Sequence, residues 1–296
     1  MNILVTGANG LVGGAIYERL NADSPNNVLA LTHSATDAAT LHCDLSRDDL
    51  GTVLHNSDMD AIVHCAAVIP YAGVTDEWVY QQNAAMDANV VRYCAQNQCR
   101  LLYLSSVAVY KDFDERINME TSPVQADILY QRGKLETEAL IQEQCPSYAI
   151  FRIPSPYGPK QAHTTVLKLF IEKALRGEPI GYYGKGSRTQ NFIHVKDIAK
   201  AAEKALGSSG NEIYNIAAAK AVSMKELAEL VVDVAQKDFG SVSTVQPVPK
   251  PDAQEGYRSN ISIQKAREML NWQPEIRLED GVSDWMHCLK VSASRS

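Results

Sequence analysis

A tyrosine and a lysine four residues apart are the first side chains in this chain with a clear chemical use. Tyr130 and Lys134 lie in a helical pattern, and a spacing of four places both on one helix face. An ammonium group beside a phenol stabilises the phenolate form, so the pair predicts a general acid/base for a carbinol oxygen. Taken alone, the same spacing also fits an exposed helix pair without a catalytic role.

Two serines favour the catalytic interpretation. Ser105 and Ser106 follow an apolar strand expected at 101–104. An open parallel sheet places its chemistry at the carboxyl ends of its strands, where a hydroxyl can hydrogen-bond a carbonyl oxygen beside Tyr130. The alternative is that both serines only cap the segment that follows.

The first thirteen residues predict a turn that holds a dinucleotide pyrophosphate. A short β-branched strand runs into Gly7, Gly10 and Gly13, and a helical pattern follows at once. Gly7 allows the turn, Gly10 lets the backbone approach the phosphates, and Gly13 lets the helix pack closely on the strand. The free N–H groups and the dipole of the helix supply positive potential.

Strands and helices that alternate must position these residues. The alternation predicts an α/β fold, a Rossmann-type doubly wound parallel sheet covered by helices, with a smaller C-terminal α/β substrate-binding region. We expect strands at 3–5, 28–31, 61–64, 101–105 and 148–152, with helical segments at 10–20, 47–54, 77–96 and 126–145.

The second half of the chain is less regular, and we assign it mainly to substrate binding. Helices are expected at 165–175, 197–205, 224–234 and 263–270, with a loop over the site at 246–254. The dinucleotide-binding domain is assigned to 1–155 with a returning segment at about 187–217, and the substrate-binding region to 156–186 and 218–296.

Composition excludes several functional classes. The 296 residues carry a net charge of -7, and no basic stripe exists for a nucleic acid. Apolar runs are shorter than a membrane span, and the first strand starts at residue 2, so we expect neither a membrane segment nor a signal peptide. Six cysteines without a CxxC pair predict no metal site and reduced thiols, hence a cytoplasmic protein.

Together these motifs resemble the NAD-dependent epimerase/dehydratase family of extended short-chain dehydrogenases/reductases, over nearly the whole chain. Similar members are UDP-galactose 4-epimerases and nucleotide-sugar 4-ketoreductases. The resemblance implies that Ser106, Tyr130 and Lys134 are catalytic, and that Asp44 contacts the adenine. The cofactor-binding residues that it implies are Gly7, Asn9, Gly10, Leu11, Val12, Gly13, Asp44, Leu45, Ala66, Ala67, Asn83, Tyr130, Lys134, Pro154 and Ser155.

Two departures from the family pattern narrow the reaction. Val107 and Ala108 stand where the family's dehydratases carry an Asp-Glu pair, and neither side chain can transfer a proton, so dehydration is not expected. Thr32 stands where NAD-specific members carry an acid, and with His33 and Ser34 it could hydrogen-bond a 2′-phosphate. We therefore favour NADP over NAD, without an arginine nearby to decide the choice.

The third departure concerns the substrate. Gln190 and Asn191 stand at the start of a late strand in place of the family's Arg-Asp, with Arg188 two residues earlier, and Ser155 replaces an asparagine. Arg258 still fits an arginine that contacts a nucleotide diphosphate. The resemblance thus implies a nucleotide sugar, held by Ser105, Ser106, Ser155, Arg188, Gln190 and Arg258.

The leading prediction is an NADP(H)-dependent reductase of a 4-keto nucleotide sugar. The alternative is a nucleotide-sugar 4-epimerase with tightly bound NAD, and a third reading is a regulator that binds the dinucleotide without turnover. The resemblance also suggests a homodimer built from the helices of Asn83 and Tyr130. Val90, Val91, Leu135 and Ala139 could supply its apolar faces, although packing on the sheet explains them equally well.

Overall fold

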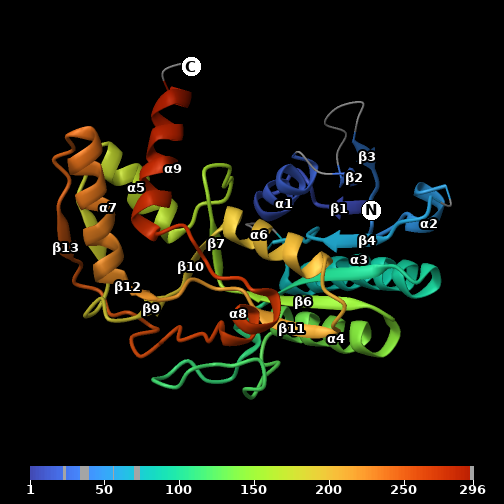
Figure 1. Cartoon of the computed structure of the whole chain (residues 1–296). Helices are drawn as coiled ribbons and strands as arrows, with labels where there is room; N and C mark the ends of the chain where they lie inside the picture. The colour runs from blue at the N-terminus through green and yellow to red at the C-terminus, as the bar shows by residue number, and fades with distance from the viewer. Residues whose placement is uncertain (23–24, 34–39, 56, 70–73, 294–296) are drawn as a thin grey trace.

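A parallel sheet of seven strands forms the centre of the molecule (Figure 1). The computed structural model describes residues 1–22, 25–33, 40–55, 57–69 and 74–293. The sheet order is β11-β6-β5-β4-β1-β2-β3, so successive strands are added on one side of β1 up to β3 and on its other side from β4 onward. An open parallel sheet has its ligand-binding crevice at the carboxyl ends of the strands at such a switch point, here β1 and β4. The strands are β1 (Asn2–Thr6), β2 (Asn27–Thr32), β3 (Leu41–His42), β4 (Ala61–His64), β5 (Arg100–Ser106), β6 (Tyr148–Ile153) and β11 (Glu212–Asn215).

Helices cover both faces of this sheet because alternate strand residues point to opposite faces and are apolar on both. On β1, Ile3 and Val5 pack into a core with α1 (Leu11–Asn21), α6 (Val195–Leu206) and α8 (Gln264–Leu270). Leu4 packs into the opposite core with α2 (Leu50–Val53), α3 (Asp76–Asn97) and α4 (Leu129–Gln144). The expected Rossmann-type fold is confirmed.

The C-terminal part has a core of its own around α5 (Val166–Leu175), α7 (Met224–Phe239) and α9 (Leu278–Ala293). Figure 1 places these helices beside the sheet, on the side where its strands end. Three short strand pairs complete this part: β7 (Ser155–Tyr157) with β10 (Phe192–His194), β9 (Thr189–Gln190) with β12 (Val222–Ser223), and β8 (Ile180–Tyr182) with β13 (Val245–Pro247). The division of the chain into two domains at the expected boundaries stays a prediction.

Several elements differ from the sequence-based expectation, and α7 for example ends at Phe239 rather than at 234. α4 starts at Leu129 rather than at 126, because the Gln131 side chain accepts hydrogen bonds from the N–H groups of Asp127 and Ile128 and holds them outside the helix. The expected loop at 246–254 begins inside β13, and α9 was not expected at all.

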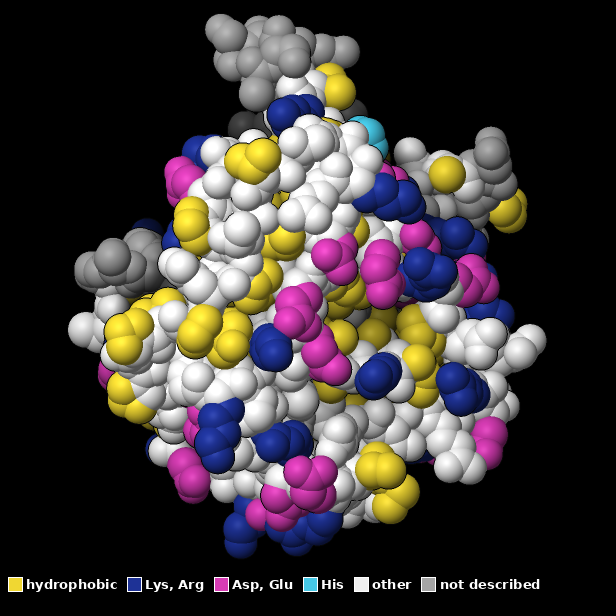
Figure 2. Space-filling view, turned by 90° about the vertical axis from the view of Figure 1, so that its left-hand side faces the viewer, with side chains coloured by type: hydrophobic (Ala, Val, Ile, Leu, Met, Phe, Trp, Pro, Cys, Tyr) yellow, Lys and Arg dark blue, Asp and Glu magenta, His cyan; other side chains and the backbone are white. Residues whose placement is uncertain are grey.

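The surface of the C-terminal part mixes charges of both signs. Figure 2 views this side and shows acidic and basic side chains interspersed, without a continuous basic patch. None of the helices in the described part of the chain combines the length and apolarity needed to span a membrane. No disulfide joins the six cysteines, all of which lie in the described part of the chain.

Candidate active site

The turn between β1 and α1 has the geometry that its three glycines predict. Gly7 has a positive φ of 64°, and a Cβ placed there would lie 2.8 Å from the backbone nitrogen of Ala66. A Cβ on Gly13 would lie 2.3 Å from the carbonyl oxygen of Gly7, so α1 can approach β1 this closely only with glycine. Gly10 donates its N–H to the same carbonyl at 2.9 Å, which closes the turn.

The N-terminus of α1 is left open for an anion. Gly10 is the N-cap and supplies no side-chain hydrogen bond, and the first turn carries no acidic residue. By contrast, the Ser223 hydroxyl caps α7 and Glu226 bonds back to it. The N–H groups of Leu11, Val12 and Gly13 therefore supply donors and positive potential, and Asn9 is exposed beside them. These residues fit a dinucleotide pyrophosphate.

The segment expected to contact the adenine is held in place by α3. Asn89 is buried and donates its side-chain amide to the carbonyls of Leu45 and Asp48, at 2.9 and 2.7 Å. Asp44 accepts hydrogen bonds from the hydroxyl and the N–H of Ser46, and these lower the pKa of its carboxyl. Asp44 thus offers a fixed carboxylate acceptor beside the crevice.

The residues expected to read a 2′-phosphate are only partly available. Thr32 is 2% exposed, so protein already covers its side chain, and its contact with a 2′-phosphate stays a prediction. The His33 side chain is 77% exposed and lies 4.0 Å from Asp44. Ser34 lies outside the described residues. The structure also brings the Arg47 guanidinium within 3.6 Å of the Asp44 carboxylate. The residues next to Thr32 in the sequence did not indicate this arginine.

The end of β4 runs beside the glycine turn and is fixed by two polar side chains. Thr6 accepts hydrogen bonds from the N–H groups of Cys65 and Ala66, both at 3.1 Å. Asn83 of α3 bonds both the N–H and the carbonyl of Val68, at 2.7 and 3.0 Å. Asn83 therefore fixes the backbone directly after Ala66 and Ala67. The side-chain amide of Asn83 is already hydrogen-bonded to protein on both sides.

The three expected catalytic residues come from β5 and α4. Ser106 ends β5, and its hydroxyl accepts a hydrogen bond from the N–H of Ala108 at 3.1 Å. Tyr130 and Lys134 lie one turn apart on α4, and Tyr130 is 40% exposed. The Lys134 ammonium donates to the Tyr103 hydroxyl at 2.9 Å and to the Leu104 carbonyl at 2.8 Å, so β5 fixes its position.

Ser105 has a different environment from Ser106, because neighbouring strand residues point to opposite faces. Its hydroxyl donates to Glu138 at 2.5 Å, and Arg152 bonds the same carboxylate at 3.0 and 2.6 Å. All three residues are buried. The structure thus assigns Ser105 to an internal ion pair, against the expectation that it contacts substrate.

The remaining polar residues expected at the substrate side lie around β7 and β9. Ser155 directly follows Pro154 at the end of β6, and it accepts a hydrogen bond from Gln190 at 2.5 Å. Arg188 pairs with Asp252 at 3.0 Å, and Arg258 pairs with Glu115 at 3.2 Å.

The two arginines are neighbours across the fold. Arg258 donates to the carbonyl of Ser187 at 3.0 Å, directly before Arg188. The Arg258 guanidinium thus contacts the backbone next to Arg188, and each arginine has a carboxylate partner of its own. The sequence did not indicate these partners, because Glu115 and Asp252 lie in loops far along the chain from the arginines that they contact.

The chain was compared with known proteins. A family model described as "NAD dependent epimerase/dehydratase family" matches residues 3–217. A Methanocaldococcus jannaschii protein provisionally named UDP-glucose 4-epimerase is 29% identical over 96% of this chain and 98% of its own. UDP-glucuronic acid decarboxylase 6 of Arabidopsis thaliana is 25% identical over 95% of this chain and 87% of its own. The solved structure of the Thermus thermophilus UDP-glucose 4-epimerase in complex with NAD is 24% identical, with a TM-score of 0.83 over 98% of this chain and 99% of that one.

Proposed function

Since this chain belongs to the NAD-dependent epimerase/dehydratase family, we propose that it is a nucleotide-sugar 4-epimerase that keeps NAD bound. One observation carries the proposal: an uncapped, glycine-lined helix N-terminus and the Ser106, Tyr130 and Lys134 side chains lie along the same sheet edge. Relatives that match over almost their whole length carry epimerase names, and one of them is solved with NAD.

The chain's own residues divide the work of binding. The backbone around Gly10 and the start of α1 would hold the pyrophosphate, and Asp44 would accept hydrogen bonds at the adenine end. Lys134 would bond the ribose next to the nicotinamide, since its ammonium is already aimed by two β5 contacts. When bound, NAD supplies a hydride acceptor and donor at the sugar carbon.

Tyr130 would move the proton. Its exposed phenol would take the proton from a sugar hydroxyl as the carbonyl forms, and return it when the carbonyl is reduced on the other face. Ser106 would orient the reacting oxygen, and Lys134, one turn further along α4, would supply a positive charge on the same helix face. Val107 is buried and, like Ala108, cannot carry a proton, so elimination of water has no acid/base pair here.

Arg188 and Arg258 would bind the diphosphate of the substrate. Guanidinium groups form paired hydrogen bonds with phosphate oxygens, and Arg258 contacts the backbone directly before Arg188. Because Asp252 and Glu115 now hold these cations, a diphosphate would share or displace the carboxylates.

An NADP-dependent reductase is the second candidate, and the composition of the segment after β2 favours it. Position 32 carries a threonine instead of an acid, and His33 and Arg47 lie beside Asp44. The side chains of His33 and Arg47 are both exposed, and the relatives' names favour the epimerase. A regulator without turnover would not require the aimed Lys134 and exposed Tyr130.

A homodimer through α3 and α4 also remains a proposal. Val90 and Val91 are buried in the core and cannot serve such an interface, whereas Ala139 is exposed. Its test is the molecular mass of the protein in solution.

The proposed reaction is tested by supplying UDP-glucose and UDP-galactose to the purified protein without added cofactor. Interconversion is expected, and Tyr130→Phe should slow it by about 10²–10⁴-fold while cofactor binding persists. Tyr148→Phe is the matched control. Tyr148 is the first residue of β6 and lies away from the carboxyl ends of the strands, so this variant should keep full activity. Equal activity of Tyr130→Phe and the control would exclude Tyr130 as the proton carrier.

A further inference from the structure

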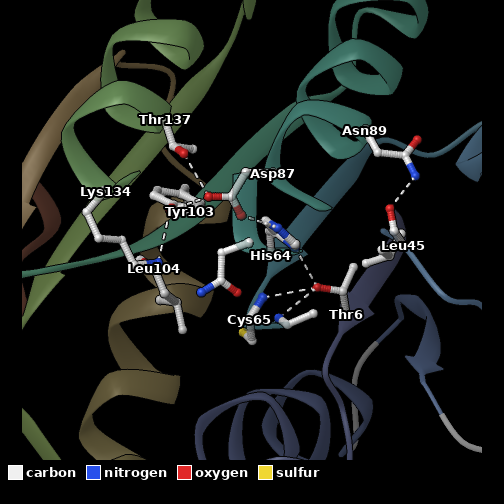
Figure 3. Close-up of polar contacts among 12 residues, drawn as sticks. Thr6, Leu45, His64, Cys65, Asp87, Asn89, Tyr103, Leu104, Lys134 and Thr137 are labelled. Atoms are coloured by element: carbon white, nitrogen blue, oxygen red, sulfur yellow. Dashed lines mark hydrogen bonds and ion pairs between the residues drawn. The ribbon is translucent and has the colours of Figure 1, made fainter. Parts of the chain in front are cut away.

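A buried carboxylate lies behind the proposed catalytic lysine. Asp87 of α3 is 5% exposed, and it accepts hydrogen bonds from three side chains that come from three elements. The donors are His64 Nε2 at 2.9 Å, the Tyr103 hydroxyl at 2.8 Å and the Thr137 hydroxyl at 2.7 Å (Figure 3). Asp87 is therefore satisfied by protein alone and faces neither solvent nor the crevice.

The direction of every hydrogen bond on the Thr6 side follows from the donors present. Thr6 already accepts two backbone N–H groups, so its own hydrogen goes to His64 Nδ1, at 2.8 Å. His64 is then neutral with its hydrogen on Nε2, and it donates that hydrogen to Asp87. A chain of oriented hydrogen bonds thus runs from the glycine turn to Asp87.

The Lys134 side of the network is fixed in the same way. Burial raises the pKa of Tyr103 well above its usual value, and the charge of Asp87 raises it further. Tyr103 therefore keeps its hydrogen, donates it to Asp87, and accepts from Lys134. The ammonium and the carboxylate each lie within 3 Å of one hydroxyl, so they form an ion pair bridged by Tyr103.

Asp87 is ionised in this setting. Burial on its own raises the pKa of its carboxyl, but the hydrogen bond from His64 and the charge of Lys134 outweigh burial and lower it. In the part of the chain that the structure describes, the titratable groups facing Asp87 are His64 of β4, Tyr103 of β5 and Lys134 of α4. Lys134 supplies the positive charge among them, and Asp87 opposes it.

We propose that Asp87 is a positioning residue that acts through Tyr103 to hold Lys134 in place and to set the electric field in which Tyr130 exchanges its proton. The proposal rests on the proposed function of Tyr130 and Lys134. Because a charge on Tyr130 also affects Tyr103, Tyr130 lies within the field of this network. Neither Asp87 nor His64 touches substrate in this arrangement, and both act through other residues.

The test compares the ionisation of Tyr130 in the purified protein and in two variants. Asp87→Asn removes the charge, while Thr137→Val removes one hydrogen bond to the same carboxylate and keeps the charge. Near-ultraviolet pH titration isolates Tyr130 by subtracting the same protein with Tyr130→Phe. Loss of a negative charge favours the phenolate, so Asp87→Asn should move the Tyr130 midpoint to lower pH. Thr137→Val should leave the midpoint in place.

A shift of the same size in both variants, no shift in Asp87→Asn, or a shift to higher pH would each overturn the proposal. If Asp87→Asn does not fold, Tyr103→Phe decides, because it removes the bridge and keeps both charges. The proposal then predicts at least a tenfold higher Kd for NAD when NAD is titrated into the protein stripped of its cofactor, and an unchanged Kd would overturn it. The titration needs no substrate, so it stands or falls separately from the epimerase assay.

Discussion

Replacing Glu138 should destabilise the fold far more than replacing a carboxylate two residues away on the same helix. The side chains of Glu138 and Arg152 are each 5% exposed, and the guanidinium contacts both carboxylate oxygens. Glu138→Met keeps the side-chain length and leaves the Arg152 charge buried without its counter-charge. Breaking a buried ion pair from one side costs about 3–5 kcal/mol. Because Arg152 keeps the Glu120 carbonyl as a partner, we expect about 3 kcal/mol.

Glu136→Met is the matched control. Glu136 pairs with Arg132, but these side chains are 48% and 55% exposed, and such pairs contribute about 0.2–1 kcal/mol. Urea unfolding of the two variants and the parent, followed by circular dichroism, gives the free energies of unfolding. Losses of equal size in the two variants would refute the reasoning, since burial would then have no bearing on the cost.

Two further predictions concern the close approach at Gly13 and the buried His194. Gly13→Ala should weaken NAD binding more than tenfold in a calorimetric titration, because its Cβ would meet the Gly7 carbonyl oxygen at 2.3 Å, whereas Gly256→Ala, with open space around it, should bind NAD normally. Burial, aided by Lys196, lowers the pKa of His194 from 6.5 to about 4. The unfolded chain thus binds a proton between these values that the folded protein does not, so stability should fall as pH drops from 6.5 to 4. His194→Gln should flatten that fall in urea midpoints measured at pH 7 and 5, and an unchanged slope would contradict the assignment.

The parts of the fold that could be predicted from the sequence are those set by local chemistry. The glycines at Gly7 and Gly13 specify their own turn, because no larger residue fits the backbone approach seen there. Apolar strands such as Ala61–His64 are continuous because both faces are covered, which is why the parallel sheet could be predicted.

The parts that could not be predicted depend on pairing over long sequence separations. Ser105 and Ser106 look equivalent along the chain, and only the position of Glu138 assigns one of them to the interior. Asp87 lies on the buried face of α3, four residues after Asn83. Its partner Tyr103 belongs to a different element, the strand β5. A polar residue at a core position of an amphipathic helix was the one available signal.

The missed α9 did carry a periodic signal. Val282, Trp285 and Met286 are spaced as one helix face, and all three are fully buried in the C-terminal core. The expected loop at 246–254 failed for another reason: Val245–Pro247 pairs with β8, a contact that its own composition does not encode.

The identity of the dinucleotide that the purified protein carries tests the central claim most directly. The protein is denatured, the released dinucleotide is identified and counted, and NADH and NADPH are titrated into the stripped protein. A 4-epimerase that retains its cofactor predicts close to one NAD per chain. A protein that is purified empty and binds NADPH more tightly than NADH would contradict the epimerase and support the reductase.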